Sequence, residues 1–223
     1  MLYKNKFQYK NLGGNELDYI KKPMDIEKRS FEIIGEEMGE HNFSENELKI
    51  IKRVIHTTAD FEYKDLLYIR EGSIEEALKL LKKGVTIYTD TNMALSGINK
   101  SALKALNCKC VCYVSDEKVA KLSKERGITR SMAAIEKAVE DGVQFFAFGN
   151  APTALFRLKE LIEEGKAKAS FVIGAPIGFV GAAESKEQFE KLNIPMITVR
   201  GRKGGSTVAA AIVNALMYMI YER

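Results

Sequence analysis

The chain is poor in the residues that build disulfide frameworks and metal centres. Among 223 residues there are four prolines, three cysteines and two histidines. The cysteines alternate at positions 108, 110 and 112, which places them on one face of a strand, where neighbouring thiols rarely pair. The chain has no C-x-x-C turn, no H-E-x-x-H pair and no G-x-G-x-x-G fingerprint. We therefore expect reduced, structural cysteines, no protein-bound metal ion and no cofactor.

Long apolar runs are missing as well. The longest, VAAAIVNALMYMI near the carboxyl terminus, is interrupted by Asn214. It is short for a membrane span and is typical of a buried helix. The amino-terminal residues carry charges but precede no apolar core and no small-residue cleavage site, which argues against export. We expect a cytoplasmic protein that has no membrane partner.

The charge is balanced rather than one-sided. A formal net charge of +4 arises from 34 basic and 30 acidic residues, which are interspersed without a long basic tract. Nucleic acid is therefore not the favoured partner, and a small anionic ligand fits the mild cationic surplus better. With 46% hydrophobic residues, the chain is long enough to bury one sizeable core.

The order of apolar patterns predicts the fold class. Helical periodicity runs from about Met24 to Met38, and a capping-box pattern at Ser44 opens a second helix that ends in a polar break at His56. Short apolar strands then alternate with helices to the carboxyl terminus. This alternation predicts an α/β protein, a single domain with a mainly parallel β-sheet flanked by helices on both faces.

Three strands in the last third of the chain end in turns of small residues that lead into helices. The turns read FGNAPT, GAPIGFVG and RGRKGGST. In a parallel sheet such turns gather at the carboxyl edge, where helix N-termini leave backbone N–H groups free to meet anions. The first turn is equally typical of a well-capped helix, whereas the third, with three cations, is the strongest anion-site signal. From their position and charge we predict that four residues contact the ligand: Asn150, Lys186, Arg200 and Arg202.

His56 is the candidate proton donor. Histidine can move a proton near neutral pH, and His56 is followed by polar residues through Asp60 and preceded by Arg53. A lone histidine is more often a satisfied structural residue, so both interpretations stay open from the pattern alone. The other histidine, His41, lies in a polar loop and is expected to be solvated.

Seven segments of the chain, in order, resemble those of the precorrin-8X methylmutase family, which includes the cobalt-precorrin-8 methylmutases. They are IEKRSF, RVIHTTAD, DTNMALSGI, TRSMAA, FGNAPTALF, GAPIGFVGAAESK and RGRKGGSTVAAA. The resemblance runs from about Asp18 onward, and the shared order is far more specific than any one segment. Because the family offers no counterpart to residues 1–14, the resemblance implies an N-terminal extension there and a methylmutase domain over residues 15–223.

The resemblance implies an isomerase of corrin-ring synthesis, on the route to cobalamin. Such an enzyme moves a methyl group from carbon 11 to carbon 12 of a tetrapyrrole and needs no nicotinamide or flavin. The family histidine that protonates the ring falls on His56, and Ser30, Arg53 and Arg130 would lie on the substrate. The acetate and propionate groups of the substrate suit the cationic edge, and any cobalt would arrive inside the macrocycle. A homodimer is implied too.

Alternatives remain at this point. The Lys-, Ile- and Glu-rich composition favours a thermophilic or anaerobic source, and hence cobalt-precorrin-8 as substrate and cobyrinate as product. The same migration on metal-free precorrin-8X would give hydrogenobyrinate. A non-catalytic corrinoid carrier would use the same edge without needing His56. A nucleotide-binding α/β enzyme is disfavoured because the phosphate-binding fingerprints are missing.

Overall fold

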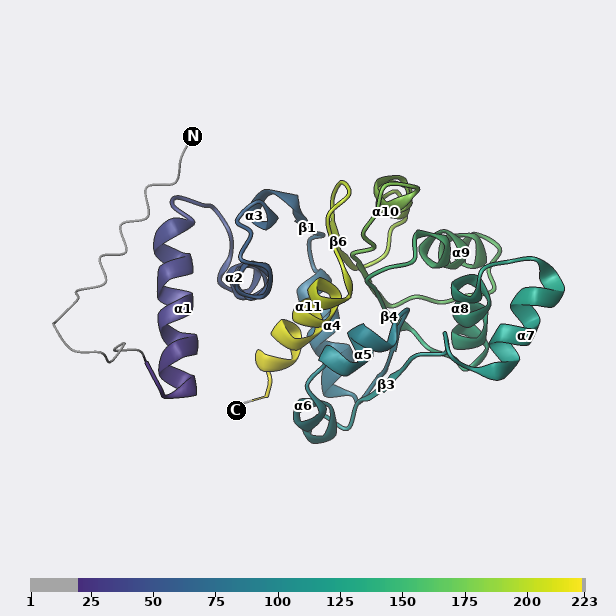
Figure 1. Cartoon of the computed structure of the whole chain (residues 1–223), viewed down its shortest axis with the longest axis horizontal. Coiled ribbons are helices and arrows are strands. Elements are labelled where there is room, and N and C mark those ends of the chain that lie inside the picture. Colours follow the sequence, from purple (N-terminus) through teal and green to yellow (C-terminus); the bar gives the residue numbers. More distant parts are fainter. Residues whose placement is uncertain (1–19, 222–223) are drawn as a thin grey trace, which may run out of the picture.

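The computed structural model describes residues 20–221, so the extension expected over residues 1–14 lies outside the described residues. Strands and helices alternate through most of this range (Figure 1). The strands are β1 (Leu67–Ile69), β2 (Thr86–Thr89), β3 (Lys109–Val111), β4 (Phe145–Phe148), β5 (Phe171–Gly174) and β6 (Met196–Val199). The helices are α1 (Pro23–Glu37), α2 (Glu45–Thr58), α3 (Tyr63–Leu66), α4 (Ser73–Lys82), α5 (Asn92–Gly97), α6 (Lys100–Ala105), α7 (Glu117–Arg126), α8 (Arg130–Glu140), α9 (Pro152–Glu163), α10 (Ala182–Glu190) and α11 (Ser206–Tyr218).

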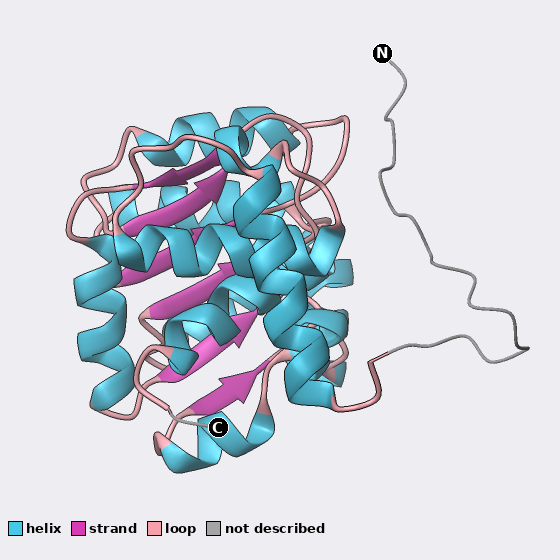
Figure 2. Cartoon of the chain, turned by 90° about the vertical axis from the view of Figure 1, so that its left-hand side faces the viewer, coloured by secondary structure: helices cyan, strands magenta, loops and turns pink. Residues whose placement is uncertain are grey.

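Within the described range the strands form one six-stranded sheet in the order β1-β6-β5-β4-β2-β3. All neighbours are parallel except β1, which pairs antiparallel with β6 at the sheet edge. Figure 2 shows the strands stacked as a ladder among the helices. The prediction of a mainly parallel sheet in a single α/β domain is confirmed.

The sheet separates two apolar cores, so helices cover both of its faces as predicted. In β4, Phe145 and Ala147 join a core with residues of α2, α4, α6 and α11. Phe146 and Phe148, which alternate with them, join a second core with residues of α7, α8, α9 and α10. Burial on both faces explains why β4 reads as an unbroken apolar run. Each buried phenylalanine contributes about 1.5–3 kcal/mol.

Helix α2 begins as predicted and ends later than predicted. Ser44 and Glu47 form the full capping box, in which each side chain bonds to the other residue's backbone N–H. The helix does not break at His56 but continues to Thr58, and Ala59 ends it in the left-handed region at φ 53°. His56 therefore sits in the last helical turn, which fixes the direction of its side chain.

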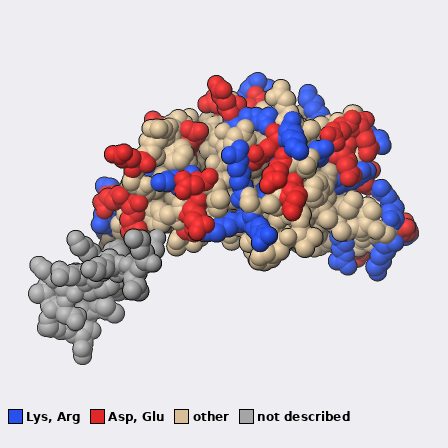
Figure 3. All heavy atoms as spheres, turned by 90° about the horizontal axis from the view of Figure 1, so that it is seen from above, with Lys and Arg blue, Asp and Glu red and all other residues tan. Residues whose placement is uncertain are grey.

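Charges of both signs are mixed on the face seen in Figure 3, in line with the expected balance. Within residues 20–221, every helix is too short or too polar to span a membrane.

Two loops at the carboxyl edge of the sheet are bonded to each other. We call residues 175–181, after β5, and residues 200–205, after β6, the paired loops. The Gly178 N–H donates to the Arg202 carbonyl at 3.1 Å, and the Gly205 N–H donates to the Ala175 carbonyl at 2.8 Å. Gly204, at φ 152°, lies so close that a Cβ there would overlap the Ala175 carbonyl oxygen. Only glycine fits this junction.

Gly204→Ala should lower the free energy of unfolding by about 4 kcal/mol, because a strained backbone and a steric overlap act together. Gly201→Ala is the matched control in the same loop. Gly201 has φ 72°, and a Cβ at this position would meet no other atom within 4 Å, so the loss should be only about 1–2 kcal/mol. Urea unfolding measures both values, and equal losses would contradict the proposed junction.

Candidate functional site

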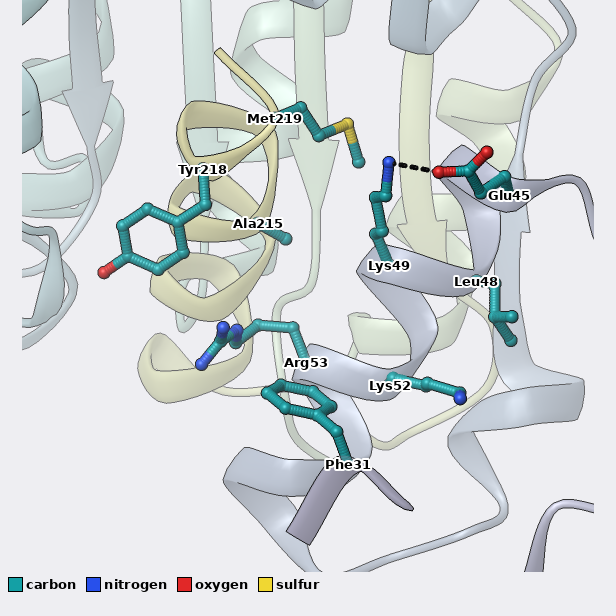
Figure 4. A pocket seen from close by; sticks show the side chains of 9 residues that line it. All are labelled: Phe31, Glu45, Leu48, Lys49, Lys52, Arg53, Ala215, Tyr218 and Met219. Carbon is teal, nitrogen blue, oxygen red and sulfur yellow. Dashed lines mark ion pairs between the residues drawn. The ribbon is translucent and has the colours of Figure 1, made fainter. Parts of the chain in front are cut away.

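His56 lies in a cluster built from α1 and α2. Its ring stacks on Phe31 with centroids 5.2 Å apart and an angle of 22° between the planes. The Arg53 guanidinium lies 4.7 Å from the Phe31 ring centroid and 5.2 Å from that of Tyr218 on α11. Figure 4 shows Arg53 beside Phe31, with Tyr218 on the neighbouring helix. The cluster thus holds one cation and one imidazole against a shared aromatic ring.

Two further residues of α1 complete this cluster. The Arg53 guanidinium pairs with the Glu27 carboxylate at 2.7 Å, and the two side chains are only 18% and 31% exposed. The Ser30 hydroxyl donates to the Ile26 carbonyl at 2.9 Å within α1, which leaves its oxygen lone pairs able to accept. Of the residues implied by the resemblance, Arg53 and His56 are brought together around Phe31, and Ser30 precedes Phe31 on α1.

The surroundings of His56 favour its neutral form. Partial burial lowers its pKa below the usual value, the positive charge of Arg53 lowers it further, and Glu27 opposes both effects. Because Arg53 and Glu27 act in opposite directions, anything that neutralises Arg53 or adds negative charge beside it will raise the pKa of His56. The proton affinity of this histidine is therefore sensitive to an anionic ligand.

Two cavities flank Arg53 and Tyr218, which line both. One, of about 470 Å³, lies between α2 and the end of α11, with Phe31, Leu48 and Lys52 in its wall (Figure 4). The other, of about 230 Å³, is lined by Thr57, Met93 and Thr207 among others. The second cavity is therefore lined by the end of α2 and by the N-termini of α5 and α11. Because α5 follows β2 and α11 follows β6, the His56 cluster adjoins the carboxyl edge of the sheet.

Of the two interpretations left open for the turn after β4, the structure favours the structural one, because the N–H groups of this turn are already bonded. The carboxylate of Asp90, which is 1% exposed, accepts the N–H groups of Gly149 at 2.8 Å, Asn150 at 2.8 Å and Ala151 at 2.7 Å. Burial raises the pKa of Asp90, although these donors oppose the rise. The chain's own carboxylate thus occupies the place that an external anion would take. The Asn150 side chain remains exposed at the edge.

The paired loops present an apolar tip. Ile177, Phe179 and Val180 are 49%, 82% and 90% exposed, unusual values for large apolar side chains that stand together. The Arg202 guanidinium lies 5.5 Å from the Phe179 ring centroid. A flat apolar ligand with carboxylate arms would find both kinds of contact here.

Lys186, which we predicted to contact the ligand, points into the protein. Its side chain is fully buried, and its ammonium donates to the carbonyls of Pro176 and Lys203. Arg200 is exposed, but its guanidinium already pairs with Glu190 at 3.1 Å and lies 4.3 Å from the Tyr68 ring centroid. Lys186 and Arg200 thus have hydrogen-bond or ion-pair partners within the chain.

Arg130 is the first residue of α8 and is exposed. Its neighbour Thr129 caps α8 and bonds to Thr153 at the start of α9, so Arg130 lies at the carboxyl edge near Asn150. Figure 1 shows α2 and α8 towards opposite ends of the molecule. Arg130 and His56 therefore belong to helices that pack in the two different cores, on opposite faces of the sheet.

Sequence reasoning missed Glu27, Phe31 and Tyr218 as parts of the site. On α1, Ser30 and Phe31 lie three and four residues after Glu27. This spacing indicates that the three side chains share one helix face. That spacing could have identified them beside Ser30. Tyr218 gave no comparable signal, because it lies within an apolar run that is typical of a core helix.

Comparison with known proteins gives one consistent result. The family model described as precorrin-8X methylmutase (CbiC) matches residues 25–219. The cobalt-precorrin-8 methylmutase of Salmonella typhimurium is 48% identical and aligns over 92% of this chain and all of its own. That of Leptospira interrogans is 41% identical, over 97% and 98%. The crystal structure of precorrin-8X methyl mutase from Thermus thermophilus is similar with a TM-score of 0.81 and 36% identity, over 87% of this chain and 96% of that one.

Substitutions at Arg53 and Glu27 should move the pKa of His56 in opposite directions. Arg53→Met removes a positive charge and should raise it, whereas Glu27→Gln removes a negative charge and should lower it. NMR titration of the imidazole protons measures both shifts, with His56→Gln identifying the signal against that of His41. Lys49→Met, which removes a cation paired with Glu45 on the same helix, is the control. Equal His56 titrations in all variants would contradict the geometry of the cluster.

Proposed function

Because the chain belongs to the precorrin-8X methylmutase family, we propose that it moves a methyl group from carbon 11 to carbon 12 of cobalt-precorrin-8, giving cobyrinate. The chain is an isomerase of cobalamin biosynthesis. The cobalt form of the substrate is supported by the names of the relatives from Salmonella and Leptospira. The single observation that carries the catalytic assignment is His56, stacked on Phe31 next to Arg53 at the carboxyl edge.

The substrate is a broad apolar ring with several carboxylate arms, and the edge offers a partner for each part. We propose that the tip of the paired loops packs on the macrocycle, while Arg53, Arg130 and Arg202 bind carboxylates. Ser30 and Asn150 would add hydrogen bonds. Arg200 would have to exchange Glu190 for a substrate carboxylate.

His56 would act as the general acid. Protonating the ring draws electron density from the conjugated system, so the carbon that receives the methyl group becomes more electrophilic. In the free chain the lowered pKa of His56 keeps its neutral form favoured. Substrate carboxylates that bind Arg53 offset its charge and raise the pKa of His56. Substrate binding would thus protonate His56, which then donates this proton in the reaction. Stacking on Phe31 would hold the imidazole ring in one orientation.

We also propose that the active form is a homodimer in the cytoplasm and that residues 15–223 make up the methylmutase domain. Two observations support the dimer. Arg130 and His56 belong to helices on opposite faces of the sheet, and Ile20, Met24 and Ile26 near the start of α1 are 46%, 82% and 45% exposed. Apolar side chains exposed together are typical of a surface that meets another subunit.

His56→Ala should lower kcat by about a hundred- to ten-thousand-fold, because general acid catalysis is worth that much, and should leave substrate affinity nearly unchanged. The assay is anaerobic incubation with cobalt-precorrin-8 and, separately, with precorrin-8X, followed by absorption spectra and mass. A spectral change at constant mass reports methyl migration. His41→Ala, which removes the other histidine, should keep full activity.

The same assay separates the alternatives. Turnover of precorrin-8X alone would assign the metal-free pathway, with hydrogenobyrinate as product. Binding of both compounds without a spectral change would support a corrinoid carrier. Normal turnover by His56→Ala would reject the acid role while leaving the methylmutase assignment intact.

Arg130→Ala should weaken substrate binding by about tenfold, because it removes a charge-assisted hydrogen bond to a carboxylate. Titration of the substrate followed by absorption measures the Kd. Lys121→Ala on α7, which removes an exposed cation paired with Glu125 on the same helix, is the control. An unchanged Kd for the Arg130 variant would take this residue out of the site.

A further inference from the structure

We propose that Lys186 is a positioning residue that holds the two paired loops as one rigid unit and so keeps their apolar tip in the shape that receives the substrate. This inference rests on the proposed function for its link to the substrate, whereas its structural part stands on the contacts of Lys186 itself. It replaces the expected direct contact between Lys186 and the ligand.

The contacts of Lys186 bridge the two loops. Lys186 lies on α10, outside both loops, and its side chain is fully buried. Its ammonium donates to the Pro176 carbonyl of the first loop at 3.0 Å and to the Lys203 carbonyl of the second at 2.9 Å. One cation therefore satisfies a carbonyl from each loop. Without it, both carbonyls would lose a charge-assisted bond, and the buried one at Pro176 would find no solvent in exchange.

The positions of these two carbonyls explain why the loops would respond together. Pro176 precedes Ile177, the first exposed residue of the tip, and Lys203 follows Arg202, whose guanidinium lies over Phe179. Backbone bonds at Gly178 and Gly205 join the same two loops. Lys186 is thus placed behind the tip, where it fixes both backbones without reaching the ligand.

A neutral residue could not replace this ammonium equally well. A buried ammonium is tolerated only where polar groups surround it, and here backbone carbonyls take that place with Glu190 nearby. Burial lowers the pKa of Lys186 to about 8, and the charge of Glu190 opposes this effect. The ammonium form therefore still predominates at neutral pH, and its hydrogen bonds to the two carbonyls are charge-assisted.

The test compares Lys186→Met, which keeps the aliphatic stem and removes the ammonium, with Lys186→Arg, which keeps the charge and the donors. Lys191→Met removes a lysine just after the same helix and is the control. Amide hydrogen exchange of the full-length protein reports the loops through Gly178 and Gly205, with the amides of β4 as reference. Steady-state turnover of the substrate that the wild type accepts gives KM and kcat separately.

In Lys186→Met we expect faster exchange at Gly178 and Gly205 together, unchanged exchange in β4, and a KM raised by about 10- to 100-fold, the usual effect of a misplaced binding surface. The change in kcat should be smaller, and Lys186→Arg should restore part of the KM. If the Met variant is insoluble, Lys186→Gln, which keeps a donor without the charge, takes its place.

Three results would overturn the inference. These are unchanged loop exchange in Lys186→Met, loosened loops with an unchanged KM, or an equal loss of protection in β4, which would indicate general destabilisation. Failure of the proposed function would show differently. The wild type would then turn over neither substrate, while the exchange measurement would still decide whether Lys186 joins the loops.

Discussion

The carboxyl edge of the sheet depends on buried charges that bind backbone rather than each other. The Asp90 carboxylate gathers three N–H groups of the turn after β4, and the Lys186 ammonium bonds a carbonyl from each of the paired loops. A buried charge left without such partners would be strongly destabilising. Each charge therefore forces the loop around it into one conformation. The exposed residues of the edge take their places from these two anchors.

The His56 cluster also holds its charged and titratable side chains in place, but through an aromatic ring and an ion pair rather than through backbone groups. Its imidazole is held by stacking on Phe31 and its proton affinity is set by Arg53 and Glu27. Arg53 and Glu27 form an ion pair, and their effects on the pKa of His56 have opposite signs. The histidine therefore responds to the difference between the two effects. A ligand carboxylate that engages Arg53 changes that difference directly. In the proposed function, ligand binding at Arg53 would therefore change the protonation of His56.

Much of the fold could be predicted from the sequence, because its signals are local. The capping box at Ser44 and Glu47 set the start of α2, and the apolar run of β4 indicated a strand covered on both faces. The end of α2 could not be predicted, since Thr57 and Thr58 read as a polar break, whereas their hydroxyls bond back to the carbonyls of Arg53 and Val54 within the helix.

The site was only partly predictable, because the sequence shows which side chains are charged but not which groups they bind in the folded chain. The residue pattern singled out His56 and the family resemblance added Arg53 as a substrate contact, and the structure brings the two together on one aromatic ring. Lys186 was expected at the edge from its position, but nothing local shows that a lysine on α10 turns inward to two carbonyls. Its burial depends on contacts between segments far apart in the sequence, such as Lys186 with Lys203.

The ion pairs of the edge differ in how readily they can be exchanged, and this difference separates binding residues from anchors. Arg200 is 54% exposed in its pair with Glu190, whose side chain is 16% exposed, so a carboxylate from outside can reach the guanidinium directly. Arg53 is more enclosed, but its other neighbours are aromatic rings, which hold the guanidinium in place whichever carboxylate it meets. Lys186 and Asp90 have no such freedom, because their partners are backbone groups that no ligand can replace. In the proposed function, a polycarboxylate would therefore replace the carboxylate partner of an arginine, while Lys186 and Asp90 hold the backbone of the loops in place.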